Sequence, residues 1–78
     1  MGNPQTPINP GEEDVLEQLE AYFETVEEDE VVTREAAVTH LTSEGFERPD
    51  ARDYIEQLVL KGYLYEVGDE LRLLPRHR

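Results

Sequence analysis

The chain has 78 residues, enough for one small domain with a single core. Its 19 acidic and 7 basic residues give a formal net charge of -12, and 37% of its residues are hydrophobic. The absence of cysteine excludes disulfides, thiolate nucleophiles and cysteine-ligated metal sites. No apolar run approaches the ~18 residues of a membrane span, and no signal segment opens the chain. We therefore expect a soluble, cytoplasmic domain without a membrane partner.

The acidic residues are concentrated in one segment. Residues 12–30 carry ten acidic side chains and no basic one, whereas residues 31–78 carry the other nine together with all seven bases. Lys61 is the only lysine. An acidic, lysine-poor composition resembles that of proteins from extreme halophiles, in which molar salt screens self-repulsion. The alternative is a mesophilic acidic protein with a basic partner.

A first helix is predicted over residues 10–27, after a disordered lead-in at residues 1–9. Asn9 is a suitable N-cap, Pro10 takes the first helical position, and Glu12 falls at the capping-box position. The acidic side chains lie outside the apolar arc, so we expect them to form a solvated face on which burial shifts no pKa. The apolar residues recur at helical spacing within an arc of about 120°: Val15, Leu16, Leu19, Tyr22, Phe23 and Val26.

Two more helices follow an acidic loop at residues 27–30. Val31-Val32 predicts a short strand, and Thr33 predicts the cap of a second helix that ends at Gly45, where a left-handed residue is favoured. Phe46 is expected to fold back on Leu41. A third helix opens at residues 48–50 and closes near residues 61–62. Its predicted inner face is formed by Ala51, Tyr54, Ile55, Leu58 and Val59.

The last third of the chain changes to the period of β-strands. Residues 63–67 and 70–74 flank Gly68-Asp69, which predicts a hairpin with a two-residue loop. This register places Leu64 opposite Leu73, Tyr65 opposite Arg72, Glu66 opposite Leu71 and Tyr63 opposite Leu74. Because an isolated hairpin is marginal in water, the strand at residues 31–32 is expected to join it in a three-stranded sheet. Residues 75–78 form a short basic tail.

This order of elements over residues 10–74 resembles the winged helix-turn-helix domains of prokaryotic transcription regulators, and also winged modules appended to replication proteins. The likeness lies in VVTREAAVTHLTSEGF and RPDARDYIEQLVLKGYLYEVGDELRLLP. It implies an α+β winged-helix fold, a three-helix bundle with a short strand and a C-terminal hairpin wing. In such domains the third helix lies in the major groove of DNA, and the wing touches the backbone or the minor groove.

The resemblance implies a small DNA-binding protein, a transcription regulator whose partner is duplex DNA. Asp50, Asp53 and Glu56 on the third helix would repel phosphate. Two structural alternatives remain open: Arg52 pairs with Glu56 four residues on, and Lys61 neutralises the end of the helix. The candidate nucleic-acid contacts are Arg34, Arg48, Arg52, Gln57, Lys61, Arg72 and Arg76.

The alternative function is a winged-helix protein-interaction module of a replication or transcription complex. Tyr22, Tyr63 and Tyr65 would then provide the apolar contacts to a second copy or to another protein. His40, expected to face solvent, and His77 lack the spacing of a metal site or a triad. A core of this size also leaves no room for a pocket of ~300 Å³. We therefore expect no enzymatic activity, no cofactor, no metal and no small-molecule substrate.

Overall fold

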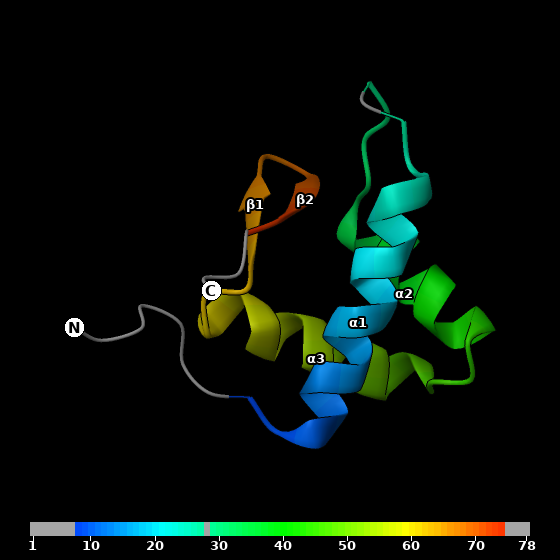
Figure 1. Cartoon of the computed structure of the whole chain (residues 1–78), viewed down its shortest axis with the longest axis vertical. Helices are drawn as coiled ribbons and strands as arrows, with labels where there is room; N and C mark the ends of the chain where they lie inside the picture. Colours follow the sequence, from blue (N-terminus) through cyan, green and yellow to red (C-terminus); the bar gives the residue numbers. More distant parts are fainter. Residues whose placement is uncertain (1–7, 28, 75–78) are drawn as a thin grey trace.

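Three helices are followed by an antiparallel hairpin in the computed structural model, which describes residues 8–27 and 29–74 (Figure 1). The predicted disordered segment, apart from Ile8 and Asn9, and the basic tail lie outside the described residues. This α+β layout is compatible with the predicted winged helix. No helix of the described part is long and apolar enough to cross a membrane. The elements are α1 (Pro10–Thr25), α2 (Arg34–Ser43), α3 (Arg48–Leu60), β1 (Leu64–Val67) and β2 (Glu70–Leu73).

The start of α1 confirms the predicted capping box. The Glu12 backbone N–H donates to Asn9 Oδ1 at 2.8 Å, and the Asn9 N–H donates to Glu12 Oε1 at 3.2 Å. Pro10 takes the first helical position, where a missing N–H has no cost. The helix ends at Thr25, two residues earlier than predicted. The segment that begins at Val26 therefore leaves the helix before the acidic loop.

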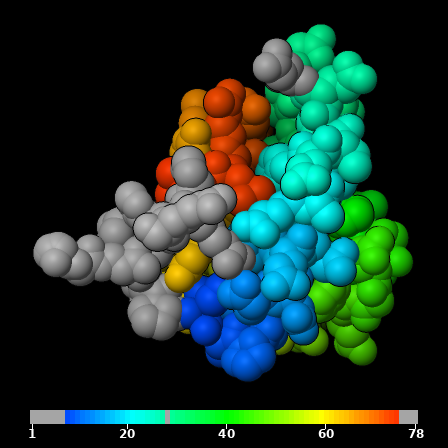
Figure 2. All heavy atoms as spheres, viewed as in Figure 1, coloured from blue at the N-terminus to red at the C-terminus, as the bar shows by residue number. Residues whose placement is uncertain are grey.

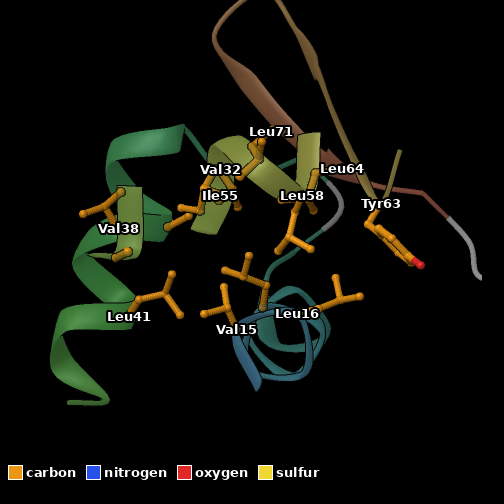
Figure 3. Packing of buried hydrophobic residues seen from close by; sticks show 13 residues of the cluster. Val15, Leu16, Val32, Val38, Leu41, Ile55, Leu58, Tyr63, Leu64 and Leu71 are labelled. Atoms are coloured by element: carbon orange, nitrogen blue, oxygen red, sulfur yellow. The ribbon is translucent and has the colours of Figure 1, made fainter. Parts of the chain in front are cut away.

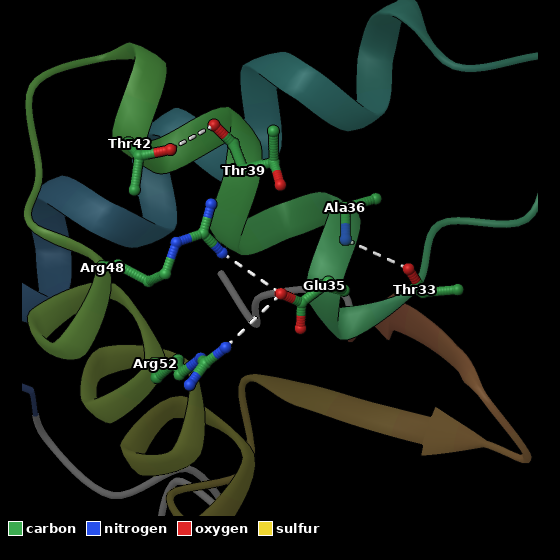
Figure 4. A network of polar contacts seen from close by, with 7 residues as sticks. All are labelled: Thr33, Glu35, Ala36, Thr39, Thr42, Arg48 and Arg52. Carbon is green, nitrogen blue, oxygen red and sulfur yellow. Dashed lines mark hydrogen bonds and ion pairs between the residues drawn. The ribbon is translucent and has the colours of Figure 1, made fainter.

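The ends of α2 and α3 share one glycine-dependent geometry. After α2, the Phe46 N–H donates to the Leu41 carbonyl and the Gly45 N–H to the Thr42 carbonyl, with Gly45 at φ 106°. The same pair of bonds closes α3, where Gly62 has φ 90°. At the start of α2, Thr33 Oγ1 accepts from the Ala36 N–H as predicted (Figure 4). Each helix is thus terminated locally, which fixes the direction of the segment that follows it.

The hairpin has the predicted register, but the third strand is almost absent. Leu64 pairs with Leu73, and Tyr65 pairs with Arg72. Residues 31–32 form no strand, and the sheet has only two strands in the described part of the chain. One isolated bridge joins Thr33 to Glu70, and the Leu71 N–H donates to the Val32 carbonyl at 2.7 Å. The expected three-stranded sheet is therefore wrong, because the chain pairs with β2 for only two residues before it diverges.

The core is one cluster to which every element contributes (Figure 3). The third helix confirms its predicted inner face, since three of its five residues are buried and two are partly buried against the cluster. Val32 is 3% exposed and Leu71 1% exposed, so the hairpin and the segment before α2 close one side of the bundle. The buried apolar residues are Val15, Leu16, Leu19, Val32, Ala37, Val38, Leu41, Ala51, Ile55, Leu58, Tyr63, Leu64 and Leu71.

Candidate nucleic-acid and protein interfaces

Two of the candidate DNA-contacting arginines converge on one carboxylate of the neighbouring helix. Arg48 Nη1 lies 3.1 Å from Glu35 Oε2, and Arg52 Nη2 lies 3.4 Å from the same oxygen (Figure 4). Both arginines are exposed on α3, whereas Glu35 is in the first turn of α2. The structural alternative that pairs Arg52 with Glu56 is wrong. The first turn of α2 is instead joined to the first two turns of α3 by exposed ion pairs that share Glu35.

Arg34, a candidate nucleic-acid contact, connects three elements. Its Nη1 donates to Glu56 Oε1 on α3 at 2.7 Å, and its Nη2 and Nε donate to the two oxygens of Glu66 on β1 at 2.8 and 3.3 Å. Hydrogen bonds to Glu66 and then to Glu56 raise the pKa of this arginine. The bidentate contact with Glu66 uses the geometry in which guanidinium binds carboxylate best. The donors that would hold a DNA phosphate are thus already engaged.

Lys61 is part of the packing of the protein. Its Nζ lies 2.6 Å from Glu12 Oε1, and the lysine side chain is 23% exposed while Glu12 is 3% exposed. The hydrogen bond from Lys61 lowers the pKa of Glu12 although burial acts in the opposite direction. The expectation that the acids of the first helix form a solvated face on which burial shifts no pKa is therefore wrong at Glu12. It fails because α3 ends against the first turn of α1.

The remaining nucleic-acid candidates are on α3, on the hairpin and in the tail. Arg72 Nη2 lies 3.0 Å from Glu70 Oε1 on the same strand, and this hydrogen bond raises the pKa of Arg72. Gln57 is half-buried on α3. Arg76 lies outside the described residues. All five basic residues that the structure describes are therefore in ion pairs with carboxylates.

The three candidate partner-binding tyrosines have different environments. Tyr63 is 8% exposed and belongs to the core cluster, so it cannot contribute to an exposed apolar patch. Tyr22 is half-buried and stacks on His40, with ring centroids 4.3 Å apart. The expectation that His40 simply faces solvent is therefore wrong, since the stacking half-buries it. Tyr65 is 36% exposed and is available on β1.

A groove of about 320 Å³ separates the hairpin from the end of α1. Figure 2 shows the hairpin, orange to red, and the end of α1 with its following loop, cyan to green, rising on either side of it. The expectation that the molecule has no hollow of this size is wrong, because the chain joins β2 only at Val32 and Thr33, directly before α2 begins. The groove is lined by Phe23, Val26, Glu27, Glu30, Val32, Tyr65, Glu70, Leu71, Arg72 and Leu73.

No protein-family model, curated protein or solved structure matches this chain. In the described part of the chain, no three His, Asp or Glu side chains are grouped as metal ligands.

Sequence reasoning missed the carboxylates that neutralise the cations. Glu35, Glu66 and Glu12 are separated from their basic partners by 13, 32 and 49 residues. No local spacing rule connects residues so far apart. The available signal was the excess of 19 acidic over 7 basic residues in the whole chain, which supplies more than two carboxylates for each cation.

Proposed function

We propose that this chain is a winged-helix module whose ligand is another protein. The helix and hairpin layout supports the winged helix. The observation that carries the functional proposal is that each described basic residue already has a carboxylate partner within 3.4 Å. Within residues 8–27 and 29–74, the protein therefore offers no unneutralised lysine or arginine to a nucleic-acid backbone.

The proposal follows from how proteins bind DNA. Affinity for duplex DNA comes largely from cations that neutralise phosphates and release counterions. Here each phosphate would have to displace a carboxylate from Arg34, Arg48, Arg52 or Arg72, and the displaced carboxylate would remain close to the phosphate. Asp50 and Asp53 are also exposed on α3, the helix that would enter the major groove. Like charges across an interface oppose association.

Binding of duplex DNA through α3 and the hairpin, which the winged-helix resemblance implies, is the competing function, and one experiment separates it from protein binding. We expect the amide NMR signals of α3 and of both strands to stay unchanged when duplex DNA is added to the ¹⁵N-labelled protein. The titration should be repeated with Glu35→Gln, which releases Arg48 and Arg52 from their shared carboxylate. A shift of the α3 and hairpin signals in the wild-type protein would overturn the proposal.

The positive arm of the experiment is a defined complex. The protein should retain a protein partner from nuclease-treated cell extract, and the same partner should bind again after both are purified. Loss of the partner on nuclease treatment would indicate that nucleic acid bridges the two.

The proposal assigns no catalytic role. Glu12 is the buried carboxylate of the described residues, and Lys61 neutralises it at 2.6 Å. A general acid or base needs a proton that substrate can reach. An ion pair enclosed between two helices does not provide one.

A further inference from the structure

The groove between the hairpin and the end of α1 has an apolar floor and polar walls. Buried Val32 and Leu71 form part of its base, and the half-buried side chains of Phe23, Val26 and Leu73 border it. Most of its exposed lining is polar. A ligand that fits it therefore has both apolar and polar side chains.

The groove lies along the edge of β2 that β1 does not cover. Leu74 N–H donates to the Tyr63 carbonyl, so alternation along an antiparallel pair directs the N–H groups of Leu71 and Leu73 away from β1. The Leu71 N–H is taken by the Val32 carbonyl. The structure shows no such bond for Leu73 among the described residues. The outward-facing Leu73 N–H can therefore donate a backbone hydrogen bond to an added strand.

The walls of the groove are acidic. Glu27 and Glu30 are exposed on the side of the groove that follows α1, and Glu70 lies on the hairpin side. Arg72, the basic residue of the lining, is already paired with Glu70. The last turn of α1, which leads into the groove, has no basic residue. Charge complementarity therefore favours a cationic ligand. A second copy of this chain would bring two acidic walls together, which opposes self-association at this face.

We propose that this groove binds an extended segment of a partner protein, in which apolar residues alternate with lysine or arginine. The inference rests on the proposed function and names its binding surface. The backbone of the segment pairs with β2 beyond Val32, its apolar side chains face Val26 and Phe23, and its cations approach Glu27 and Glu30. Main-chain bonds supply affinity in this mode, and the alternate side chains supply specificity.

The test uses the full chain and three synthetic peptides. One peptide alternates lysine with leucine, one alternates lysine with serine, and one alternates glutamate with leucine. We expect the lysine–leucine peptide to bind at least about tenfold more tightly than either of the others. Only this peptide offers both apolar side chains to the buried residues of the groove and cations to its glutamates. Equal binding of the lysine–serine peptide would overturn the proposal, since it would reduce the interaction to general attraction by an acidic protein.

Amide hydrogen exchange locates the bound peptide. On binding, the Leu73 amide should become protected, while the Leu71 amide, already bonded to Val32, should change little. Protection confined to other elements would overturn the proposal. Two results with the free protein would also overturn it. NMR shifts of the groove residues on dilution would show that a second copy of the chain occupies the groove. Contacts of residues 75–78 with Phe23 would show that the chain itself occupies it.

A pair of matched variants tests the acidic walls. Glu27→Gln/Glu30→Gln should weaken the lysine–leucine peptide roughly tenfold. Glutamine at position 30 can still accept the Glu27 backbone N–H, which Glu30 accepts at 3.1 Å. Glu17→Gln/Glu24→Gln removes the same charge from exposed positions of α1 that do not line the groove, and should leave affinity nearly unchanged. Equal weakening by both variants would contradict a site at the groove.

The two proposals fail in different ways. If duplex DNA shifts α3 and the hairpin, the proposed function is wrong. If a reconstituted protein partner binds but neither protects Leu73 nor responds to Glu27→Gln/Glu30→Gln, the proposed function stands and the groove is not its binding surface.

Discussion

Lys61 Nζ and Glu12 Oε1 are 2.6 Å apart and join the C-terminal end of α3 to the first turn of α1. The same glutamate oxygen accepts the Asn9 N–H, so one carboxylate both caps α1 and binds α3. A capping residue is ordinarily a local feature, worth about 1 kcal/mol. Here it also anchors a contact between residues that are far apart in the chain.

Replacing Glu12 should therefore be costly. Glu12→Gln keeps an acceptor for Asn9 but leaves Lys61 without its counter-charge, and we expect the free energy of unfolding to fall by about 3 kcal/mol. Urea denaturation at neutral pH measures the loss. The matched control is Glu17→Gln on the exposed side of α1, which should change stability by less than about 0.5 kcal/mol. Similar losses for both variants would show that the buried pair has no special role.

Acid should remove the contribution of the same pair. In the folded protein the pKa of Glu12 lies below its ordinary value of 4.5, mainly because of the hydrogen bond from Lys61. The stabilisation is therefore fully present above pH 4.5 and is lost as the pH falls through the lower folded value. Between neutral pH and strong acid, the stability difference between wild type and Glu12→Gln should shrink. A difference that stays constant with pH would contradict the altered pKa.

The exposed ion pairs on α2 and α3 should contribute little. Glu35→Gln removes the partner of both Arg48 and Arg52, and we expect a loss below about 1 kcal/mol because exposed pairs are solvated and screened. Arg34→Met, which breaks contacts with α3 and β1 together, should cost more than Glu35→Gln. Thermal unfolding of the two variants compares them directly. The reverse order would show that Arg34 does not stabilise the hairpin.

Salt should stabilise the protein as a whole. The net charge of -12 produces self-repulsion in the folded state, and mobile ions screen it. We expect the midpoint of thermal unfolding to rise steeply between about 0.1 M and about 2 M KCl, as the predicted halophilic origin requires. A flat dependence would contradict that origin and favour a mesophilic protein whose acid serves a basic partner.

The glycine that ends α2 should resist substitution. Gly45 has φ 106°, a conformation that a residue with a Cβ rarely adopts, although no atom lies within 4 Å of the position of an added Cβ. Gly45→Ala should therefore cost about 1 kcal/mol through backbone strain alone. Glu44→Ala, one residue earlier with φ -91°, is the control and should be nearly neutral. An unchanged stability for Gly45→Ala would indicate that the turn relaxes.

Features determined by neighbouring residues were predictable from the sequence. The capping box at Asn9, the cap at Thr33, the glycine at position 45 and the hairpin register across Gly68-Asp69 each depend on a few consecutive positions. Their stereochemistry leaves few alternatives. The structure confirms all four.

Features that depend on distant residues were not predictable in this way. The short apolar pair Val31-Val32 has the composition of a strand, but of these two residues only Val32 pairs with the hairpin. How much of this segment reaches β2 depends on the packing of α1 and α2, which neighbouring residues do not determine. Likewise, nothing near Lys61 in the chain indicates Glu12. The groove is a consequence of the same packing, because it lies where the segment before Val32 is not paired with β2.

In the described part of the chain, a backbone bond from the Leu71 N–H to the Val32 carbonyl and a bridge between Thr33 and Glu70 join the segment before α2 to the hairpin. Residues 29–31 form no strand pairing that would set the length of the connection from α1. Inserted or deleted residues there would alter one wall of the groove while the helices keep their packing, at an entropic cost of only about 0.6 kcal/mol for a doubling of loop length. Homologous chains can therefore diverge in what they bind through changes in loop length alone, without redesign of the core.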